Sequence, residues 1–378
     1  MHLSFWEHDA APDADFIVVG AGLIGLQTAL ELRALAPDAR IAVLERGVLP
    51  YGASTRNAGF ACFGSLTEIL HDFDTMGEDA ALAVVEQRWR GLARLRARVG
   101  EAALGFEPHG GYELLSTAQL PALERMDEAN ARLRPLFGRD VFQLDAAMRA
   151  ASGFGPQVAA LVANPLEGQL HSGRMMRALS RLAVDAGIAL YGGVTVRSLH
   201  EGAAGVELHA GSAADPRELR FRAARVALCT NGLLGELAPA CAVRPGRGQV
   251  LVTAPVAGLR WRGTFHMDEG YWYFRNIGDR VLLGGGRHLD FAGEETSAMG
   301  LSAVIQQAQE RLLRETILPG SKVAIEHRWS GIMGFSADKQ PIVRAVSPRV
   351  AIGFGCNGMG VALGADIAAR TAALLHGC

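Results

Sequence analysis

The chain has 378 residues, of which 49% are hydrophobic and 20% are charged, and its formal net charge is −2. This length and apolar content allow a large core and exceed one ordinary domain. The balanced charge argues against a nucleic-acid-binding surface. Five scattered cysteines without a C-x-x-C pair argue against a dithiol centre or a zinc knuckle, so no metal site is expected. Neither a signal peptide nor a transmembrane segment is predicted, and a cytoplasmic location is expected.

The N-terminal region carries a dinucleotide-binding pattern. An apolar run of strand length, Phe16–Val19, leads into glycines at 20, 22 and 25, and a helical apolar pattern follows. Gly20 permits a tight turn, Gly22 lets a pyrophosphate approach the backbone, and Gly25 lets the helix pack closely on the strand. The helix N-terminus offers free N–H groups to the phosphates. A second strand ends at Glu45, which can accept hydrogen bonds from a ribose. A glycine-rich turn without a ligand is the alternative.

The remaining elements are predicted in chain order from hydrophobic periodicity and turn residues. Residues 47–65 read as a loop. Helices are expected at 76–99, 118–135, 173–187, 299–315 and 359–375, and strands at 111–116, 188–191, 194–196, 225–229, 249–253, 270–275, 280–284 and 349–354. Short connections between 244 and 284 indicate antiparallel strands.

This order of elements predicts an α/β fold with an α+β part. A discontinuous Rossmann-like domain that binds FAD or NAD(P) is expected at residues 1–88, 155–236 and 336–378. An inserted antiparallel-sheet domain for the substrate is expected at residues 89–154 and 237–335.

A second glycine cluster, Gly353–Gly360, also follows a predicted strand and opens a helix. A second dinucleotide site would need another strand and acid, and the printed sequence stops at Cys378. We therefore interpret the cluster as a helix N-terminus whose N–H groups face the N1 and O2 end of a flavin, where negative charge builds on reduction. A ligand-free strand-to-helix turn is the alternative.

Several segments together resemble the flavoprotein family of D-amino acid oxidase, glycine oxidase and sarcosine oxidase. They are Gly52-Ala-Ser-Thr-Arg-Asn-Ala-Gly59, Ala227–Gly232, Arg247-Gly-Gln249, Tyr271–Arg275 before Val281–Gly286, Trp329-Ser-Gly331 with Asp338 and Pro341, and the closing glycine run. The Gly-Ala-Ser-x-Arg-Asn segment looks most like the γ-glutamylputrescine oxidase branch. The resemblance spans nearly the whole chain and implies non-covalent FAD, because the cysteine of covalently flavinylated relatives has no counterpart here.

The motif and the resemblance together predict the cofactor-binding residues. Ser54, Thr55 and Arg56 would lie under the pyrophosphate, Asn57–Gly59 beside the flavin ring, and Val194 or Val196 against the adenine unless they are only core residues. The full predicted set is Gly20, Gly22, Leu23, Ile24, Gly25, Glu45, Arg46, Ser54, Thr55, Arg56, Asn57, Ala58, Gly59, Val194, Val196, Thr230, Asn231, Gly232, Gly331, Gly355, Asn357, Gly358, Met359 and Gly360.

The resemblance also implies a substrate pocket. Tyr271 and Tyr273 resemble its aromatic wall, although aromatic strand residues also serve as core, and His266 is the histidine to test first. Asp338 resembles an acid that organises a turn. Met333 stands where the amino-acid-oxidising members place a carboxylate-binding arginine. Methionine cannot pair with a carboxylate, which argues against a simple glycine or D-amino-acid substrate. The candidates for a relocated clamp are Arg247, Arg275 and Arg328, and the alternative is that they are solvated surface residues.

The predicted reaction is hydride transfer from the carbon next to an amine nitrogen to flavin N5, followed by hydrolysis of the imine. The substrate is expected to be an amine or amino-acid-like molecule. A flavin dehydrogenase acting on a hydroxy acid or other CH–OH substrate, and a flavin-binding subunit without turnover of its own, are the alternatives. Some oxidases of the family place an oxygen-activating lysine over the flavin, and neither Lys322 nor Lys339 matches it. Fast reaction with oxygen is therefore not implied, and the electron acceptor is oxygen or another molecule such as a quinone. The sequence does not determine the oligomeric state, and a homo-oligomer is possible.

Overall fold

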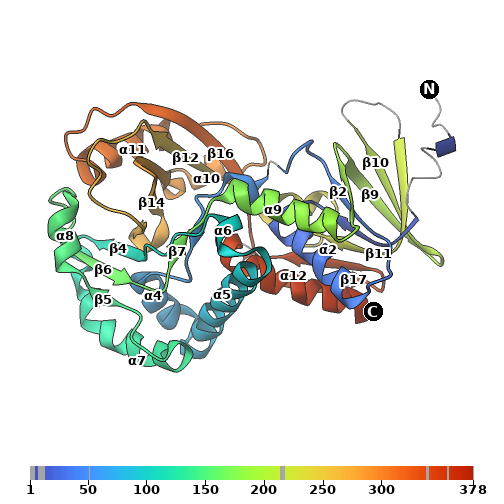
Figure 1. Ribbon diagram of the computed structural model, residues 1–378, viewed down its shortest axis with the longest axis horizontal. Coiled ribbons are helices and arrows are strands. Elements are labelled where there is room, and N and C mark those ends of the chain that lie inside the picture. The colour runs from blue at the N-terminus through green and yellow to red at the C-terminus, as the bar shows by residue number, and fades with distance from the viewer. Residues whose placement is uncertain are drawn as a thin grey trace.

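The computed structural model describes residues 5–6, 13–50, 52–212, 218–337, 340–355 and 357–377. Asp338, Lys339 and Cys356 lie outside the described residues. Within these ranges, two eight-stranded sheets with their helices form two lobes, and a two-stranded ribbon accompanies them (Figure 1). The predicted α/β class with an antiparallel second part is confirmed.

The first sheet is built around parallel strands from both ends of the chain. Its order is β17-β18-β11-β1-β2-β8, and β9 and β10 extend it as an antiparallel meander next to β11. The strands are β1 (Asp13–Val19), β2 (Ile41–Glu45), β8 (Ala189–Gly192), β9 (Thr195–Gly202), β10 (Gly205–Gly211), β11 (Glu218–Leu228), β17 (Ile342–Ser347) and β18 (Val350–Phe354). Strands β18, β11, β1, β2 and β8 run parallel, as the strand–helix–strand pattern requires.

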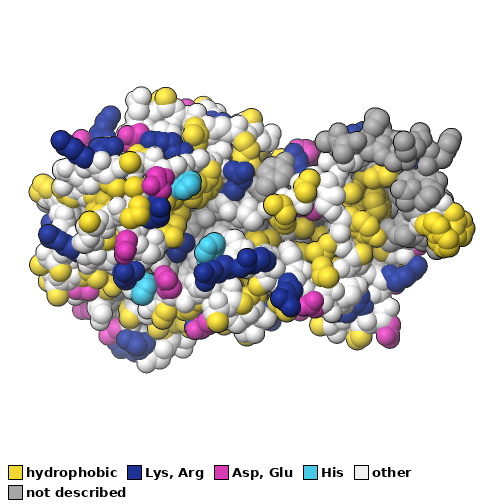
Figure 2. Space-filling view, turned by 45° about the horizontal axis from the view of Figure 1, so that its top comes forward, with side chains coloured by type: hydrophobic (Ala, Val, Ile, Leu, Met, Phe, Trp, Pro, Cys, Tyr) yellow, Lys and Arg dark blue, Asp and Glu magenta, His cyan; other side chains and the backbone are white. Residues whose placement is uncertain are grey.

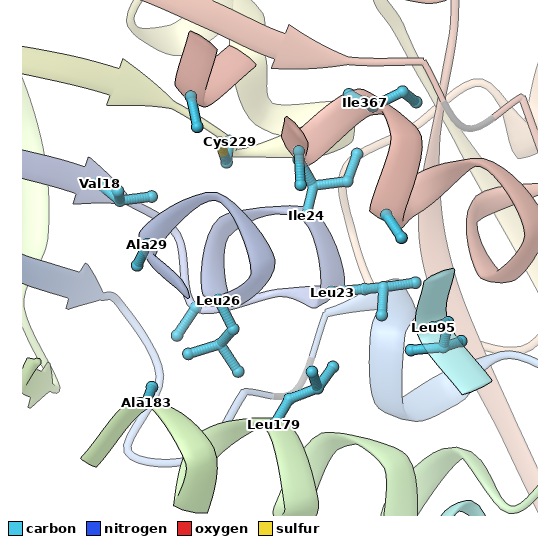
Figure 3. Close-up of a cluster of buried hydrophobic side chains, with 14 of the residues drawn as sticks. Val18, Leu23, Ile24, Leu26, Ala29, Leu95, Leu179, Ala183, Cys229 and Ile367 are labelled. Carbon is cyan, nitrogen blue, oxygen red and sulfur yellow. The ribbon is translucent and has the colours of Figure 1, made fainter. Parts of the chain in front are cut away.

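A helical layer covers one face of this sheet. Helix α2 (Leu23–Leu35) lies between α9 (Ser172–Asp185) and α12 (Gly360–Gly377), and Figure 3 shows Leu23, Leu26 and Leu179 in their shared core. Helix α5 (Glu78–Val99) crosses against α12, because Gly91 carries no side chain: a Cβ there would lie 1.9 Å from the Ala362 carbonyl oxygen.

The second sheet is mostly antiparallel and has the order β16-β12-β15-β14-β13-β4-β6-β5. Its strands are β4 (Gly111–Leu115), β5 (Gln143–Leu144), β6 (Ala160–Asn164), β12 (Arg244–Thr253), β13 (Thr264–Met267), β14 (Trp272–Ile277), β15 (Arg280–Gly285) and β16 (Ile325–Phe335). Only β13 and β4 pair in parallel within it. The stacked rings of Phe265 and Phe274, with Trp261 packed edge-on against both, fill its core.

The strand pairing corrects one predicted domain boundary. The boundary at residue 155 assigned β6 to the cofactor domain, but β6 pairs with β4 and β5 in the second sheet. Helix α5 likewise packs on the first lobe through α12, although the boundary at residue 88 divides it. The two-domain division itself stays a proposal.

The other helices connect or flank the sheets. They are α3 (Ala53–Arg56), α4 (Leu66–Met76), α6 (Glu101–Leu104), α7 (Met126–Phe137), α8 (Ala146–Ser152), α10 (Phe291–Glu294), α11 (Ala303–Leu312), the 3₁₀ segments η1 (Thr117–Arg125), η2 (Asn231–Glu236), η3 (Asp268–Gly270) and η4 (Arg287–Leu289), and the π-helical η5 (Leu313–Ile317); the ribbon pairs β3 (Phe60–Ala61) with β7 (Gly168–Gln169).

Two local predictions differ from this structure. The segment 47–65 is not all loop, because α3 and β3 lie within it. The predicted helix 118–135 begins as the 3₁₀ segment η1, which contains Pro121 and so lacks one helix N–H donor.

Two further observations concern the charges on the surface and the search for membrane-spanning helices. Figure 2 shows acidic and basic side chains interspersed on the face it displays. Among the described residues, no helix is both long and apolar enough to cross a membrane.

Candidate active site

A cavity of about 1030 Å³ lies between the two lobes and receives residues from both. All predicted cofactor-binding residues line it except Gly25, Thr55 and Gly355. The three predicted pocket residues, His266, Tyr271 and Tyr273, line the same cavity. The fold therefore brings segments from the beginning, middle and end of the chain to one site.

One end of the cavity is formed by the first glycine turn. Gly20 has a φ of +102°, and a Cβ on Gly25 would lie 1.8 Å from the Gly20 carbonyl oxygen, so helix α2 reaches the strand only with glycine at 25. The N-terminus of α2 opens onto the cavity through Gly22, Leu23 and Ile24. The Ser54 hydroxyl accepts a hydrogen bond from the Leu23 N–H at 2.8 Å, which places the short helix α3 over the N-terminus of α2.

Glu45 lies beside this turn at the end of β2. Its carboxylate accepts hydrogen bonds from the N–H groups of Ala21 and Gly47, at 2.8 and 2.9 Å. The Val194 N–H donates to the Glu45 carbonyl oxygen at 2.9 Å, so Val194 and Val196 line the cavity next to the acid. A carboxylate oxygen accepts more than one hydrogen bond, and Glu45 can therefore also hold ribose hydroxyl groups.

The polar side chains of residues 54–57 hold helix α3 and its flanking turns in place. The Thr55 hydroxyl donates to the Pro50 carbonyl oxygen at 2.8 Å, which explains why Thr55 does not line the cavity. The Asn57 amide bonds to the carbonyl oxygens of Ala53 and Ser54 and accepts from the Gly59 N–H. Arg56 was expected to neutralise a phosphate, yet its guanidinium donates to the Ser330 carbonyl oxygen at 2.9 Å and so joins the loop to β16.

The middle of the cavity contains buried polar atoms that suit a polar ligand. The Thr230 hydroxyl and the Asn231 Oδ1 atom are buried without a hydrogen-bond partner in the described part of the chain. Asn231 has a φ of +51°, a strained value that the turn after β11 imposes. Unpaired buried polar groups are costly. Together with the glycine turns and the open helix N-terminus, they fit a bound dinucleotide.

The second glycine cluster forms the turn before α12. Gly358 has a φ of +90°, and the Asn357 side-chain oxygen accepts a hydrogen bond from the Ser336 N–H at 2.9 Å. Gly355 packs against Pro341, where a Cβ would lie 2.3 Å from the Pro341 Cα, so its role is structural. Asn357–Gly360 line the cavity at the N-terminus of α12.

The remaining wall is aromatic and comes from the second sheet. His266 and Tyr273 are directly opposite each other on β13 and β14, so both side chains point into the cavity, and Phe60 packs edge-on against each ring. Burial lowers the pKa of His266 to about 4 and raises that of Tyr273 to about 12. Both groups are therefore neutral near pH 7. Tyr271 is 44% exposed and lies at the rim.

The three arginines expected as a relocated carboxylate clamp do not line the cavity. Arg247 pairs with the buried Glu294 at 2.8 Å, and Arg328 bonds to Gln306 and Glu310. Arg275 is buried behind Gly59, where a Cβ would lie 3.1 Å from its guanidinium.

Other arginines line the cavity instead. Met333 does line the cavity, as do Arg88 and Arg287, which we did not predict. Arg287 directly follows Val281–Gly286, a segment of the family resemblance, and that position was the available sequence signal.

A buried cluster lies behind the aromatic wall. Donor atoms of Cys62, Glu167 and His266 lie within 4.8 Å of one another. Burial raises the pKa of the Cys62 thiol and raises that of Glu167 to about 8, so both groups hold their protons near pH 7. A structural zinc site has four ligands, and the described residues bring three donor groups together here.

Comparisons with known proteins agree with this site. A model of the FAD-dependent oxidoreductase family, DAO, matches residues 15–374. The chain is 26% identical over 369 residues to "Probable oxidoreductase OrdL" of Rhizobium meliloti, covering 93% of this chain and 80% of that protein.

Solved structures share the fold. Glycine oxidase from Geobacillus kaustophilus superposes with a TM-score of 0.75 at 21% identity, covering 96% of this chain and 94% of that one. L-proline dehydrogenase from P. horikoshii gives 0.73 at 16% identity, covering 96% and 93%. Because the family match runs from the first strand to the last helix, the chain belongs to the DAO family of FAD-dependent oxidoreductases, and FAD is the cofactor of this enzyme.

Proposed function

We propose that this enzyme oxidises a C–N bond of an amine or amino-acid-like substrate. The observation that carries the proposal is the chemistry of the cavity wall at its substrate end. Aromatic rings of Phe60, Tyr271 and Tyr273 lie there together with carboxylates. Aromatic faces and carboxylates are the two kinds of group that attract a protonated amine.

The carboxylates come from three separate elements. Glu68 lies on α4 and pairs with Arg88 at 2.8 Å, Glu269 follows β13, and Glu295 follows α10 and pairs with Arg244 at 3.7 Å. Glu68, Glu269 and Glu295 all line the cavity. Because arginines pair with Glu68 and Glu295, Glu269 is the carboxylate of these three whose charge attracts a cationic amine. The structurally similar proteins named glycine oxidase and L-proline dehydrogenase support the same substrate class.

In the proposed reaction the substrate loses a hydride from the carbon next to its nitrogen, while the nitrogen lone pair forms the C=N bond. Bound FAD supplies the two-electron acceptor. Water then hydrolyses the resulting imine to a carbonyl compound and an amine. The chain's own residues orient the substrate: Tyr273 and Phe60 limit its position, and the neutral His266 imidazole can accept a hydrogen bond without carrying charge.

The cofactor-binding set is proposed as predicted, with the structural roles of Gly25, Thr55 and Gly355 assigned above. We propose dissociable FAD, since the Cys62 thiol at the cavity is held in its unreactive protonated form. The electron acceptor is left to experiment. Lys322, the lysine within the described residues, is exposed and does not line the cavity.

The test is the flavin absorbance of the purified enzyme under anaerobic conditions, with amines, N-methyl amino acids, D- and L-amino acids and hydroxy acids. We expect bleaching by an amine-containing compound and none by its hydroxy analogue. Reoxidation by air with peroxide formation would identify an oxidase, whereas reoxidation only by a quinone would identify a dehydrogenase. Bleaching by hydroxy acids alone would refute C–N oxidation.

A further inference from the structure

Arg287 differs from the other arginines at the cavity. It lies directly after β15, in a turn that Gly286 makes possible with a φ of +85°. Its side chain lines the cavity, and its Nε atom is buried without a hydrogen-bond partner. Among the described residues, none forms a hydrogen bond or an ion pair with this guanidinium.

The neighbouring arginines are all engaged. Arg88 bonds to Glu68 and to the Phe63 carbonyl oxygen, and Arg56 bonds to Ser330. The carboxylates whose charges act on Arg287 are those of Glu295 and Glu294, but Arg244 pairs with Glu295 at 3.7 Å and Arg247 holds Glu294 at 2.8 Å. Arg287 therefore keeps a positive charge whose hydrogen-bonding capacity is unused.

The guanidinium is nevertheless held in a defined position. Its central carbon lies 4.2 Å from the centre of the Phe335 ring and 5.0 Å from that of Phe291. The absence of a side chain at Gly246 makes this possible, since a Cβ there would lie 2.4 Å from the Phe335 ring and 3.0 Å from the Arg287 Nε. Ring contacts of this kind orient a guanidinium without using its N–H groups.

A half-buried guanidinium without an anion is unfavourable, and an arginine fork matches the two oxygens of a carboxylate. We propose that Arg287 binds the carboxylate of the substrate. In the amino-acid-oxidising members of the family this role belongs to an arginine at the position of Met333. The proposal rests on the proposed function and narrows its substrate class to amines that carry a carboxylate, such as amino acids or N-substituted amino acids. The aromatic rim formed by Tyr271 and Phe291 lies next to this anion site.

Binding of unreactive carboxylates to the FAD-loaded enzyme tests this directly. Acetate, propionate and benzoate, each compared with its uncharged amide, are titrated while the visible absorption spectrum of the flavin is recorded. We expect at least one carboxylate to bind more tightly than its amide. Arg287→Met should weaken carboxylate binding roughly ten- to hundredfold, the loss expected for a charged hydrogen-bonded pair, and leave amide binding unchanged.

Two further variants complete the design. Arg287→Lys keeps the positive charge but loses the paired N–H donors of the guanidinium, so its affinity for carboxylates should be intermediate. Arg262→Met is the matched control, because Arg262 is exposed on the second lobe and pairs with Asp279, so it should bind carboxylates as the wild type does.

The outcomes separate this inference from the proposed function. The role of Arg287 would be overturned if the wild type and Arg287→Met bound carboxylates equally well. It would also be overturned if simple amines bleached the flavin of the wild type and this enzyme showed no preference for carboxylates over amides. Both results would leave C–N oxidation standing. Carboxylate binding that depends on Arg287, in an enzyme that no amine bleaches, would support this site and refute the proposed reaction.

Discussion

Replacing Glu167 with glutamine should change how the stability of this enzyme depends on pH. The Glu167 side chain is 3% exposed, and burial raises its pKa from 4.5 to about 8. Its Oε1 atom accepts hydrogen bonds from the N–H groups of Phe63 and Gly64, at 2.9 and 3.3 Å. A glutamine oxygen can accept both bonds but has no proton to release.

The direction and size of the effect follow from the two pKa values. In the unfolded chain Glu167 loses its proton near pH 4.5, whereas in the folded protein it keeps the proton until about pH 8. Its contribution to stability is therefore complete below pH 4.5 and is lost as the pH rises through 8. The loss amounts to at most roughly 5 kcal/mol. For a chain of this length, that corresponds to roughly 6 °C in Tm.

Thermal unfolding of the FAD-loaded wild type and Glu167→Gln, followed by tryptophan fluorescence between pH 5 and 9, measures the difference. We expect similar Tm values at pH 5 and a higher Tm for the variant at pH 9. Glu124→Gln, which removes an exposed carboxylate, is the control for the lost charge. Parallel curves for the wild type and Glu167→Gln would refute the reasoning, because proton binding by Glu167 would then not differ between folded and unfolded chains.

Three other changes test the cofactor and substrate ends of the cavity. Gly25→Ala places a methyl group 1.8 Å from the Gly20 carbonyl oxygen, so we expect roughly 1–3 kcal/mol lower stability and less retained FAD per protein. Gly235→Ala is the control: its methyl group meets nothing within 4 Å, so this variant should match the wild type in both measurements. Thr230→Val removes the buried unpaired hydroxyl and should raise the FAD dissociation constant of the apoprotein roughly two- to tenfold, and unchanged affinity would show that this hydroxyl does not contact the cofactor. His266 is neutral above about pH 5, so His266→Asn and the wild type should show kcat/KM profiles of the same shape between pH 6 and 9. A rise or fall of kcat/KM with pH in this range that only the wild type shows would contradict the burial of this imidazole.

Local sequence spacing was enough to predict the dinucleotide turn and the parallel strands around it. Gly20, Gly22, Gly25 and Glu45 lie within 26 residues, inside one strand–helix–strand unit. The resemblance then indicated distant segments such as Val194 and Thr230, which the fold places along the same cavity. Local spacing did not predict β6, and only its pairing with β4 shows that this strand belongs to the second sheet.

The family of the protein and its cofactor were thus determined by the sequence, because they depend on backbone shape and on glycines at set intervals. The substrate side was decided by the tertiary structure. The sequence does not distinguish Arg247, Arg328 and Arg287, because they differ in the groups that surround each guanidinium in the folded protein. The acid Glu294 neutralises the first and Gln306 and Glu310 bind the second, while Phe291 and Phe335 surround the third without accepting its hydrogen bonds. Whether a charge is free to bind a ligand depends on every group within a few ångströms of it, and those groups come from strands and helices far apart in the chain.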